Sequence, residues 1–421
     1  MKETIFKRVA FVNLGCKLNF SEISTWAREF MTNGFERVNE RTIADLYVIN
    51  TCSVTEQANK KCRQTIRYLH RLAPSAHIVV SGCYAQLNAK EIYEMEGVDL
   101  VVGNEQKAEL FSLATNLLKY GISGCYTSST EEITSFFPAY SSGDRTRSFL
   151  KVQDGCDYHC TYCTVPLARG VSRNIPIAQL VEQAKTIASH GIKEVVLTGV
   201  NTGDFGKSTG ESFLDLLISL AAVNEVKRWR ISSIEPNLIT LDILEWMFQT
   251  PSFLPHFHLP LQSGSNTILA RMKRRYNREF FANRVKFIRE AMPHAFIGVD
   301  VIVGFPGEGE AEFEETTSFL SQLSPSFLHI FPFSRRINTP ADSFSLQVSH
   351  LEKRARVAHL TKLSDHFYNN FYNLNRGREE EVLFEAKERG GLMSGFTRNY
   401  LKIEQPFQKD KIGEIIKIIV P

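Results

Sequence analysis

The sequence predicts an α/β protein in three parts: a parallel α/β sandwich, a partial (β/α)6 barrel and a small all-β module. Two stretches in which strands alternate with helices, followed by a stretch with strands alone, predict this division. Short β-branched runs alternate with helix-length segments in residues 6–120, and again in residues 148–375. Residues 376–421 hold short strands separated by glycine-rich turns, which favour an OB-like barrel. Residues 121–147 are rich in Ser, Thr and Gly and predict a linker.

Composition narrows the class of protein. A chain of 421 residues is too long for one ordinary core, and 43% hydrophobic with 23% charged residues is typical of a globular protein. A net charge of +3 does not by itself indicate a nucleic-acid partner, so any basic surface must be local. Without a long apolar run or a signal peptide, we expect no membrane partner and a cytoplasmic location. In that reducing compartment the eight cysteines are expected to serve metals or catalysis.

The first part carries three cysteines at equivalent places. Its strands are expected at Arg8–Leu14, Leu46–Asn50, His77–Ser81 and Asp99–Val102, and its helices at Ser21–Met31 and Glu56–Leu72. Cys16, Cys52 and Cys83 each follow one of these strands. Because the carboxyl ends of parallel strands meet at one edge of a sheet, the three thiols are expected to share a site. Cys62 and Cys125 break the pattern and are interpreted as bystanders.

Six strand–helix units predict the barrel. The expected strands are Phe149–Gln153, Lys193–Leu197, Arg228–Ser232, Phe257–Leu261, Ile297–Val303 and Phe327–Phe331. A long helix is expected at Leu351–Asn375. The strands of the last module are expected at Glu380–Ala386, Leu392–Arg398, Tyr400–Glu404 and Glu414–Ile419.

The loop after the first barrel strand holds Cys156, Cys160 and Cys163 in a CxxxCxxC spacing. Three thiolates meet there without a local fourth ligand, whereas a closed structural zinc site takes four. A 4Fe-4S cluster with three cysteine ligands leaves one iron open for a small molecule. A zinc knuckle or incidental thiols are the alternative interpretations.

This loop, with the aromatic Tyr162 before its last cysteine, resembles the signature of the radical-SAM superfamily. The resemblance implies S-adenosylmethionine (SAM) as a cofactor and a 5′-deoxyadenosyl radical that abstracts hydrogen from the substrate. Three further segments resemble SAM-contacting stretches of that superfamily: LTGVNTGDFG for the amino group, SSIEP for the ribose hydroxyls and VIVGFPGE for the adenine. They implicate Thr198 and Gly199, Ser233 and Glu235, and Val303, Gly304 and Glu308 respectively. Each segment alone also fits an ordinary strand-to-helix turn.

Two cysteine trios on one chain resemble the methylthiotransferase family. The stretches that carry the resemblance are NLGCKLNFSE, INTCSV, SGCYAQ, DGCDYHCTYCTVPLARG, HLPLQSGS and PFSRRINTPA. The resemblance implies a second 4Fe-4S cluster on Cys16, Cys52 and Cys83 that carries the sulfur to be inserted, and a C-terminal TRAM domain that binds RNA. The cluster cysteines would then carry the chemistry.

The family modifies either an adenosine of tRNA or an aspartate of a ribosomal protein. Asp157 after the first loop cysteine, together with GVNTGDFG, resembles the branch acting on N6-threonylcarbamoyladenosine next to the anticodon, where a methylthio group enters at carbon 2. Isopentenyladenosine in tRNA and a ribosomal-protein aspartate remain alternative substrates, and an iron–sulfur RNA-binding sensor is the non-enzymatic alternative. The implied partners are a tRNA anticodon stem-loop and an electron donor such as flavodoxin or ferredoxin. The sulfur donor is left open.

Local basic patterns bear on the RNA partner. Lys60, Arg63, Arg67 and Arg71 fall at helical spacing and predict a stripe that contacts phosphates, with a solvated helix face as the alternative. A second basic run has a solvated surface as its alternative and consists of Lys273, Arg274, Arg275 and Arg278. Phe396 and Tyr400 fit either contacts with unstacked bases or core packing.

Overall fold

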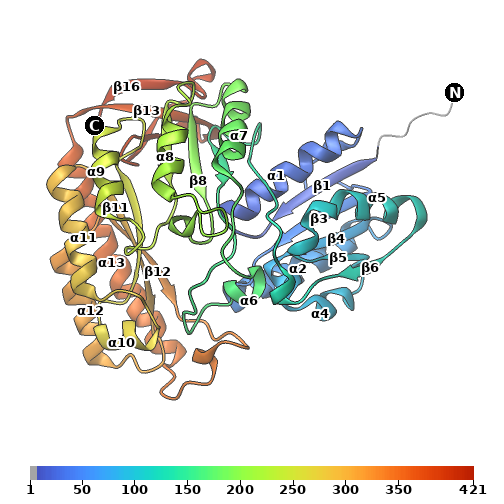
Figure 1. The fold of residues 1–421 in the computed structure, drawn as a ribbon, viewed down its shortest axis with the longest axis horizontal. Coiled ribbons are helices and arrows are strands. Elements are labelled where there is room, and N and C mark those ends of the chain that lie inside the picture. Colours follow the sequence, from blue (N-terminus) through green and yellow to red (C-terminus); the bar gives the residue numbers. More distant parts are fainter. Residues whose placement is uncertain (1–6) are drawn as a thin grey trace.

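The computed structural model describes residues 7–421 and shows the predicted α/β class (Figure 1). The expected first residue of the N-terminal domain, residue 6, lies outside this range. The N-terminal part is a six-stranded parallel sheet in the order β2-β1-β3-β4-β5-β6. Its strands are β1 (Arg8–Asn13), β2 (Glu36–Val38), β3 (Leu46–Thr51), β4 (His77–Gly82), β5 (Leu100–Val102) and β6 (Gly124–Tyr126).

Helices cover both faces of this sheet, so its strands are apolar on both sides. The helices are α1 (Lys17–Thr32), α2 (Glu56–Leu72), α3 (Cys83–Leu87), α4 (Ala89–Tyr93) and α5 (Leu110–Tyr120). Along β1, Val9 and Phe11 pack against α1 and α5, whereas Ala10 and Val12 face the core formed with α2, α3 and α4. This alternation across a doubly covered sheet explains the continuous apolar runs in the sequence.

Two short strands were not predicted. β2 and β6 have three residues each, and such lengths give too little periodicity to detect. β6 also corrects the linker, because residues 124–126 pair with β5 as part of the sheet. Later in the expected linker, Ala139 and Ser141 are buried and Tyr140 bridges to Leu150, so this segment packs along the barrel.

The second part is an open barrel of two three-stranded parallel sheets. Its strands are β7 (Ser148–Lys151), β8 (Glu194–Thr198), β9 (Arg228–Ile231), β10 (His256–Gln262), β11 (Phe296–Val303) and β12 (Phe327–Pro332). A bridge between Ser233 and His258 joins the two sheets. Within the described residues β12 and β7 do not pair, so the barrel stays open on that side.

The barrel helices lie outside the strands (Figure 1). They are α7 (Ile177–Ser189), α8 (Phe213–Ala221), α9 (Leu241–Gln249), α10 (Asn266–Arg271), α11 (Arg278–Ala291), α12 (Glu310–Leu323) and α13 (His350–Asn375). The short helix α6 (Val165–Arg169) lies instead against α3 of the N-terminal part. Short 3-10 turns lie at Glu105–Glu109, Thr130–Glu132, Thr202–Asp204, Pro340–Asp342 and Lys409–Lys411. Within residues 7–421, no helix has both the length and the apolar content needed to cross a membrane.

The C-terminal module is a four-stranded antiparallel sheet in the order β15-β14-β13-β16. Its strands are β13 (Glu379–Arg389), β14 (Leu392–Thr397), β15 (Lys402–Pro406) and β16 (Ile415–Ile419). β15 begins two residues later than predicted because Tyr400 has a positive φ of 67° and belongs to the turn. The module packs on the barrel, where Arg228 Nη2 donates to the Glu381 carbonyl at 2.8 Å.

Candidate active site

The first three cysteines follow three neighbouring strands. Cys16 caps α1 just after β1, Cys52 follows β3, and Cys83 opens α3 after β4. Burial is the main cause that raises the pKa of the Cys52 thiol to about 12, and the nearby Cys83 and Cys16 contribute to this rise. The structure therefore places these three thiols together at the carboxyl edge of the sheet.

Backbone geometry and a polar network support this edge. Gly82 has a φ of +99°, and a Cβ on it would lie 2.4 Å from Asn50 Oδ1, so the turn into Cys83 requires glycine. Asn19 Nδ2 donates to Asn50 Oδ1 at 2.7 Å, and the Cys16 thiol donates to Asn19 Oδ1 at 3.0 Å. Cys62 on α2 is buried in the core beside the trio, with its sulfur 3.8 Å from the Cys52 carbonyl oxygen, and Cys125 is exposed on β6.

The second trio lies in the loop that leaves β7. The backbone N–H of Tyr158 lies 3.4 Å from the Cys156 sulfur, and that of Val165 lies 3.5 Å from the Cys163 sulfur. Burial raises the pKa of Cys156 and of Cys163 to about 12, so as free thiols they stay protonated at neutral pH. Such thiols become thiolates when a metal centre binds them.

Two arginines donate to cysteine sulfurs, a role that the sequence analysis did not predict for either. Arg169 Nε lies 3.2 Å from Cys83 Sγ, and Arg274 Nη1 lies 3.1 Å from Cys160 Sγ. The second guanidinium nitrogen of Arg169, Nη2, is buried and has no hydrogen-bond partner among the described residues. Arg274 belongs to the predicted basic run Lys273–Arg278, but the run was interpreted as a surface feature because nothing in its spacing indicates that one member points inward.

The cysteine thiols of the two trios fit iron–sulfur clusters better than single metal ions. Within residues 7–421, one group of His, Cys, Asp or Glu side chains has all donor atoms within 4.8 Å, and it contains no cysteine. The thiols of each trio are therefore spread wider than a single zinc ion requires, as suits a four-iron cluster. N–H groups aimed at the sulfurs stabilise the negative charge of such a cluster.

A buried ionic network fixes the first sheet against the barrel. The carboxylate of Glu22 on α1 accepts from Lys107 at 2.7 Å, Lys151 at 3.1 Å and Arg169 at 3.2 Å. Asp154 joins through Lys151 at 2.6 Å and Arg169 at 2.9 Å. Burial alone would raise the pKa of Glu22, but Lys107 and Arg169 lower it far below its usual range. The carboxylate stays ionised and holds the two trios in a fixed relation.

Both trios border one cavity of about 440 Å³. Cys16 contributes from the first trio and Cys163 from the second. The remaining wall comes from the barrel and its loops, including Tyr162, Ser233 and Asp300. A molecule in this cavity would touch the edges of both cysteine sites at once.

Comparisons with known proteins agree with this arrangement. The model of the Radical SAM superfamily matches residues 150–320, and that of Uncharacterized protein family UPF0004 matches residues 8–103. Threonylcarbamoyladenosine tRNA methylthiotransferase MtaB of Bacillus subtilis is 39% identical over 97% of this chain and 93% of its own length. The chain belongs to the MtaB-type radical-SAM methylthiotransferases. The resemblance predicted from the cysteine motifs is confirmed, and so is the expectation of an enzyme that uses SAM and 4Fe-4S clusters.

Other relatives of this methylthiotransferase are more distant. MtaB of Aquifex aeolicus is 37% identical, covering 98% of this chain and all of the relative. A tRNA-2-methylthio-N(6)-dimethylallyladenosine synthase of Thermodesulfovibrio yellowstonii is 29% identical over 98% of this chain and 95% of its own length. Among solved structures, the radical SAM methyltransferase TsrM of Kitasatospora setae has a TM-score of 0.61 at 15% identity, covering 80% of this chain and 75% of that one. That likeness concerns the fold.

The predicted SAM-contact residues lie at the carboxyl ends of barrel strands. Ser233 lines the cavity, and Glu235 forms an ion pair with Arg274. Thr198 is buried at the end of β8, and Gly199 follows it, where a Cβ would lie 3.0 Å from Gln153 Oε1.

The remaining predicted residues belong to the turn after β11. Val303 is fully buried, and Gly304 has a φ of +73°. Glu308 is buried too, where it accepts from the Gly304 N–H and from Arg356 Nη1 at 2.9 Å. The structure thus gives Glu308 an internal role as the brace of this turn.

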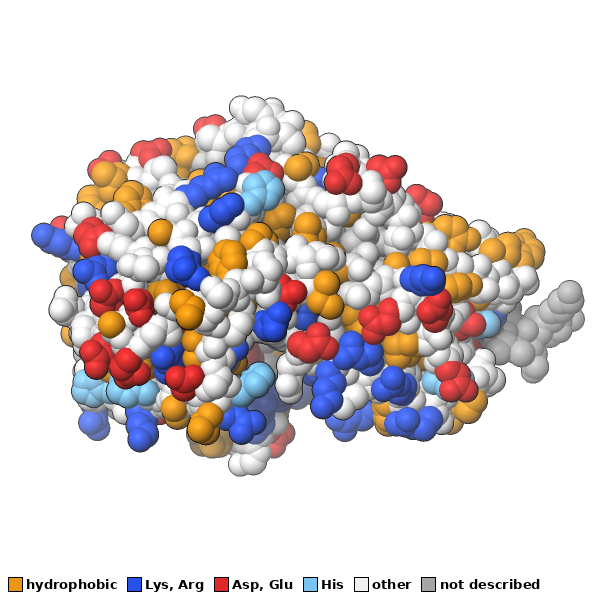
Figure 2. Space-filling model, turned by 90° about the horizontal axis from the view of Figure 1, so that it is seen from below, with side chains coloured by type: hydrophobic (Ala, Val, Ile, Leu, Met, Phe, Trp, Pro, Cys, Tyr) orange, Lys and Arg blue, Asp and Glu red, His pale blue; other side chains and the backbone are white. Residues whose placement is uncertain are grey.

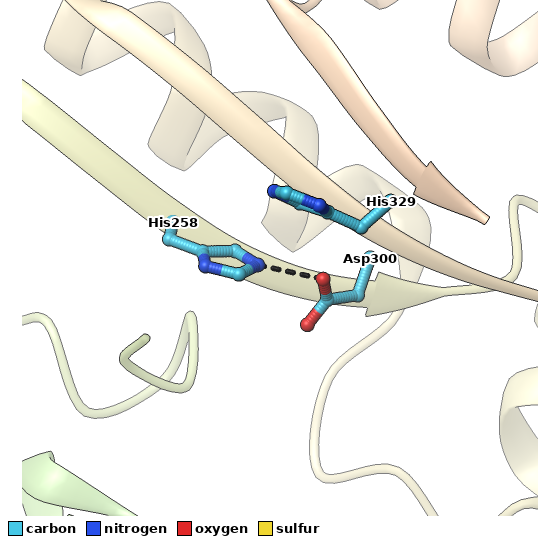
Figure 3. Close-up of side chains that lie close together, drawn as sticks. All are labelled: His258, Asp300 and His329. Carbon is cyan, nitrogen blue, oxygen red and sulfur yellow. Dashed lines mark hydrogen bonds and ion pairs between the residues drawn. The ribbon is translucent and has the colours of Figure 1, made fainter. Parts of the chain in front are cut away.

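A polar group lies inside the barrel on β10, β11 and β12 (Figure 3). His258 Nε2 and Asp300 Oδ1 are 2.6 Å apart, and the rings of His258 and His329 are 4.6 Å apart. Asp300 also lines the cavity. Sequence reasoning missed this group because its members are 42 and 29 residues apart in the chain and share no motif.

Only part of the predicted basic stripe on α2 is exposed and available to a partner. Lys60, Arg67 and Arg71 are exposed, but Arg63 is held by Glu56 at 2.9 Å and by the Tyr84 hydroxyl at 2.8 Å. Figure 2 shows Lys and Arg side chains gathered on the lower face, on the side of the N-terminal sheet. An RNA-binding role of the stripe stays a prediction.

Proposed function

We propose that this protein inserts a methylthio group at carbon 2 of N6-threonylcarbamoyladenosine in tRNA, next to the anticodon. The observation that carries the proposal is the shared cavity, which Cys16 borders from one trio and Cys163 from the other. Carbon–sulfur bond formation at an unactivated carbon requires a radical source and a sulfur source near the same atom. The identity of 39% to a protein named for this reaction supports the choice of substrate.

Each trio has a separate proposed role. Cys156, Cys160 and Cys163 would hold one 4Fe-4S cluster, and Cys16, Cys52 and Cys83 the other. When bound, the first supplies the electron that cleaves SAM and the second supplies the sulfur. Arg274 and Arg169 orient a cysteine of each trio and place positive charge beside it.

The barrel supplies the SAM-binding surface in this proposal. Thr198 and Gly199 are proposed for the amino group, Ser233 and Glu235 for the ribose hydroxyls, and the turn of Val303 and Gly304 for the adenine. All lie at the carboxyl ends of strands, where barrel active sites form. Ile302 and Phe333 add an apolar wall to the cavity that keeps water from the reacting atoms.

The partners follow from the same reaction. A low-potential electron donor such as flavodoxin or ferredoxin is required to reduce the SAM-cleaving site, and a cytoplasmic location brings the enzyme to tRNA. Lys60, Arg67 and Arg71 are proposed to contact RNA phosphates.

The test is an anaerobic reaction of the reconstituted, reduced enzyme with SAM and anticodon stem-loop RNAs. We expect a methylthio product on the RNA with threonylcarbamoyladenosine, detected by nucleoside mass spectrometry together with 5′-deoxyadenosine. Product on dimethylallyladenosine RNA instead would assign the other tRNA branch, and product on a ribosomal peptide would assign the protein branch. If SAM were not cleaved with any of these three substrates, the protein would be interpreted as an iron–sulfur RNA-binding sensor.

A further inference from the structure

A second cavity, of about 370 Å³, also borders Cys16. Residues from all three parts of the chain and the segment before the barrel line it: Lys17 beside Cys16, Arg145 and Arg147, Arg230 and His256 of the barrel, and Tyr400 of the C-terminal module. Four of these six side chains are cationic, and no Asp or Glu lines the cavity. The wall is therefore strongly positive although the whole chain carries a net charge of only +3.

Part of this positive charge has no partner within the described residues. Arg147 pairs with Glu385 at 2.7 Å, and Arg230 Nε pairs with Glu194 at 3.0 Å. Lys17 and Arg145 have no carboxylate within 4.0 Å in the described part of the chain. Arg230 is 2% exposed, and its Nη2 is buried without any hydrogen-bond partner in residues 7–421. A buried guanidinium nitrogen left unpaired is costly, so the cavity suits an anionic ligand.

Aromatic rings hold three of the arginines in place. Arg145 lies over Phe20 at 4.6 Å, Arg147 over Phe396 at 4.9 Å and Arg230 over Tyr400 at 4.6 Å. Tyr400 is stacked on Phe396 with 4.7 Å between ring centroids. Stacked guanidinium groups keep their donors oriented, so a planar anion would meet a site that is already organised.

The cavity lies beside the proposed reaction site. Cys16 borders both cavities. Arg230 belongs to β9 and His256 to β10, so the wall of the second cavity includes two neighbouring strands of the barrel. The two cavities are therefore neighbours across Cys16.

The N6 substituents named among the relatives differ in charge. Threonylcarbamoyl ends in a carboxylate, whereas dimethylallyl is a neutral hydrocarbon. Carbon 2 and the N6 nitrogen share the Watson–Crick edge of adenine. A nucleoside with carbon 2 at the first cavity therefore carries its N6 group only a short distance away, toward a neighbouring pocket.

We propose that this second cavity binds the carboxylate of the N6 substituent, with Lys17, Arg145 and Arg230 as its donors, and that it selects anionic over apolar N6 groups. The inference rests on the proposed function, since it names the part of the substrate that these residues recognise. A backbone phosphate of the RNA offers related chemistry, so the experiment must separate the two anions.

The experiment measures the affinity of the cluster-loaded enzyme, without SAM or reductant, for three fluorescent anticodon stem-loops of one sequence. They carry threonylcarbamoyladenosine, its neutral methyl ester, or plain adenosine. We expect the wild type to bind the free acid about tenfold tighter than the ester. Lys17→Met should abolish that preference while leaving the affinity for ester and adenosine RNAs unchanged. Lys286→Met on the exposed face of α11 is the matched control and should keep the preference.

Equal weakening of all three RNAs by Lys17→Met would assign the cavity to a phosphate, and a wild type without preference for the free acid would overturn the proposal. Because Lys17 adjoins Cys16, iron content is measured for each variant, and Arg145→Met serves as a second variant that leaves this neighbourhood intact. It should reduce the preference in the same sense. Turnover is scored separately: a charge preference without methylthio product would refute the proposed reaction but keep the carboxylate site.

Discussion

Arg169 Nε donates a hydrogen bond to the sulfur of Cys83 across 3.2 Å, and thereby connects the barrel to the N-terminal cysteine site. Arg169 ends α6, only six residues after Cys163 of the other trio. The same guanidinium also pairs with Glu22 and Asp154. One short segment therefore links both cysteine sites and the ionic network between them.

Replacing Arg169 with Gln is expected to separate the two activities. The loss of positive charge beside Cys83 should weaken the cluster there, since removing such an outer partner typically costs about 10–100-fold in metal affinity or activity. Methylthio transfer should fall by that order while SAM cleavage continues. Iron content and both products measure this, and Arg169→Lys should retain more transfer because it keeps the charge. Unchanged transfer in Arg169→Gln would show that the hydrogen bond has no functional role.

Arg274 is expected to affect the opposite activity. It donates to Cys160 and forms an ion pair with Glu235, so Arg274→Gln removes a donor and leaves a carboxylate unpaired beside the SAM-cleaving site. We expect 5′-deoxyadenosine formation to fall at least about tenfold. The nearby Lys273→Gln, at an exposed position, serves as the control and should cleave SAM normally. Equal effects of the two variants would contradict a specific role for Arg274.

Glu22→Gln tests the contact between the two parts. Glu22 is fully buried among Lys107, Lys151 and Arg169, so removing its charge leaves cations without compensation. Breaking a buried ion pair in this way typically costs about 3–5 kcal/mol. Urea unfolding of the reduced protein should show a loss of this order. The double variant Glu22→Gln, Lys107→Met should recover part of it, and a double variant less stable than the sum of its parts would argue against the pairing.

The sequence predicted the fold to within a few residues for the longer strands because alternating apolar runs report burial directly. It also singled out the six cysteines proposed as cluster ligands: Cys16, Cys52 and Cys83 because each follows a strand of one sheet, and Cys156, Cys160 and Cys163 because of their spacing in one loop. Arg169, Arg274 and Lys17 could not be assigned in the same way. A charged residue in a loop has no periodicity, and only the packing of distant segments shows whether it points to solvent or to a sulfur. The basic stripe on α2 shows the converse, because Arg63 is already paired with Glu56.

His329 is expected to make stability depend on pH. Burial lowers the pKa of His329 to about 4, and the neighbouring His258 contributes to this shift. In the unfolded chain the pKa of this histidine is about 6.5, so above pH 6.5 the imidazole is neutral in both the folded and the unfolded state. As the pH falls from 6.5 toward 4, only the unfolded chain binds the proton. The folded state should therefore lose about 2 kcal/mol between pH 6.5 and pH 5 through this group.

The variant His329→Gln should lack that part of the pH dependence. Free energies of unfolding at the two pH values, compared for wild type and variant, measure the difference. His350→Gln, at an exposed position at the start of α13, is the control. A slope that stays the same in His329→Gln would mean that another group titrates in this range.

The cysteine trios should be separable by two alanine variants. Cys163→Ala removes a proposed ligand of the SAM-cleaving cluster, so both 5′-deoxyadenosine and methylthio product should fall below detection. Cys83→Ala removes a ligand of the other trio, and it should still form 5′-deoxyadenosine while transferring no methylthio group. Each variant should also lose about four of the roughly eight irons per chain. Cys62→Ala, in the core beside the first trio but outside it, should keep both products. If Cys83→Ala abolished SAM cleavage as well, the first sheet would be a structural support for the barrel, and the shared cavity would have a single chemical centre.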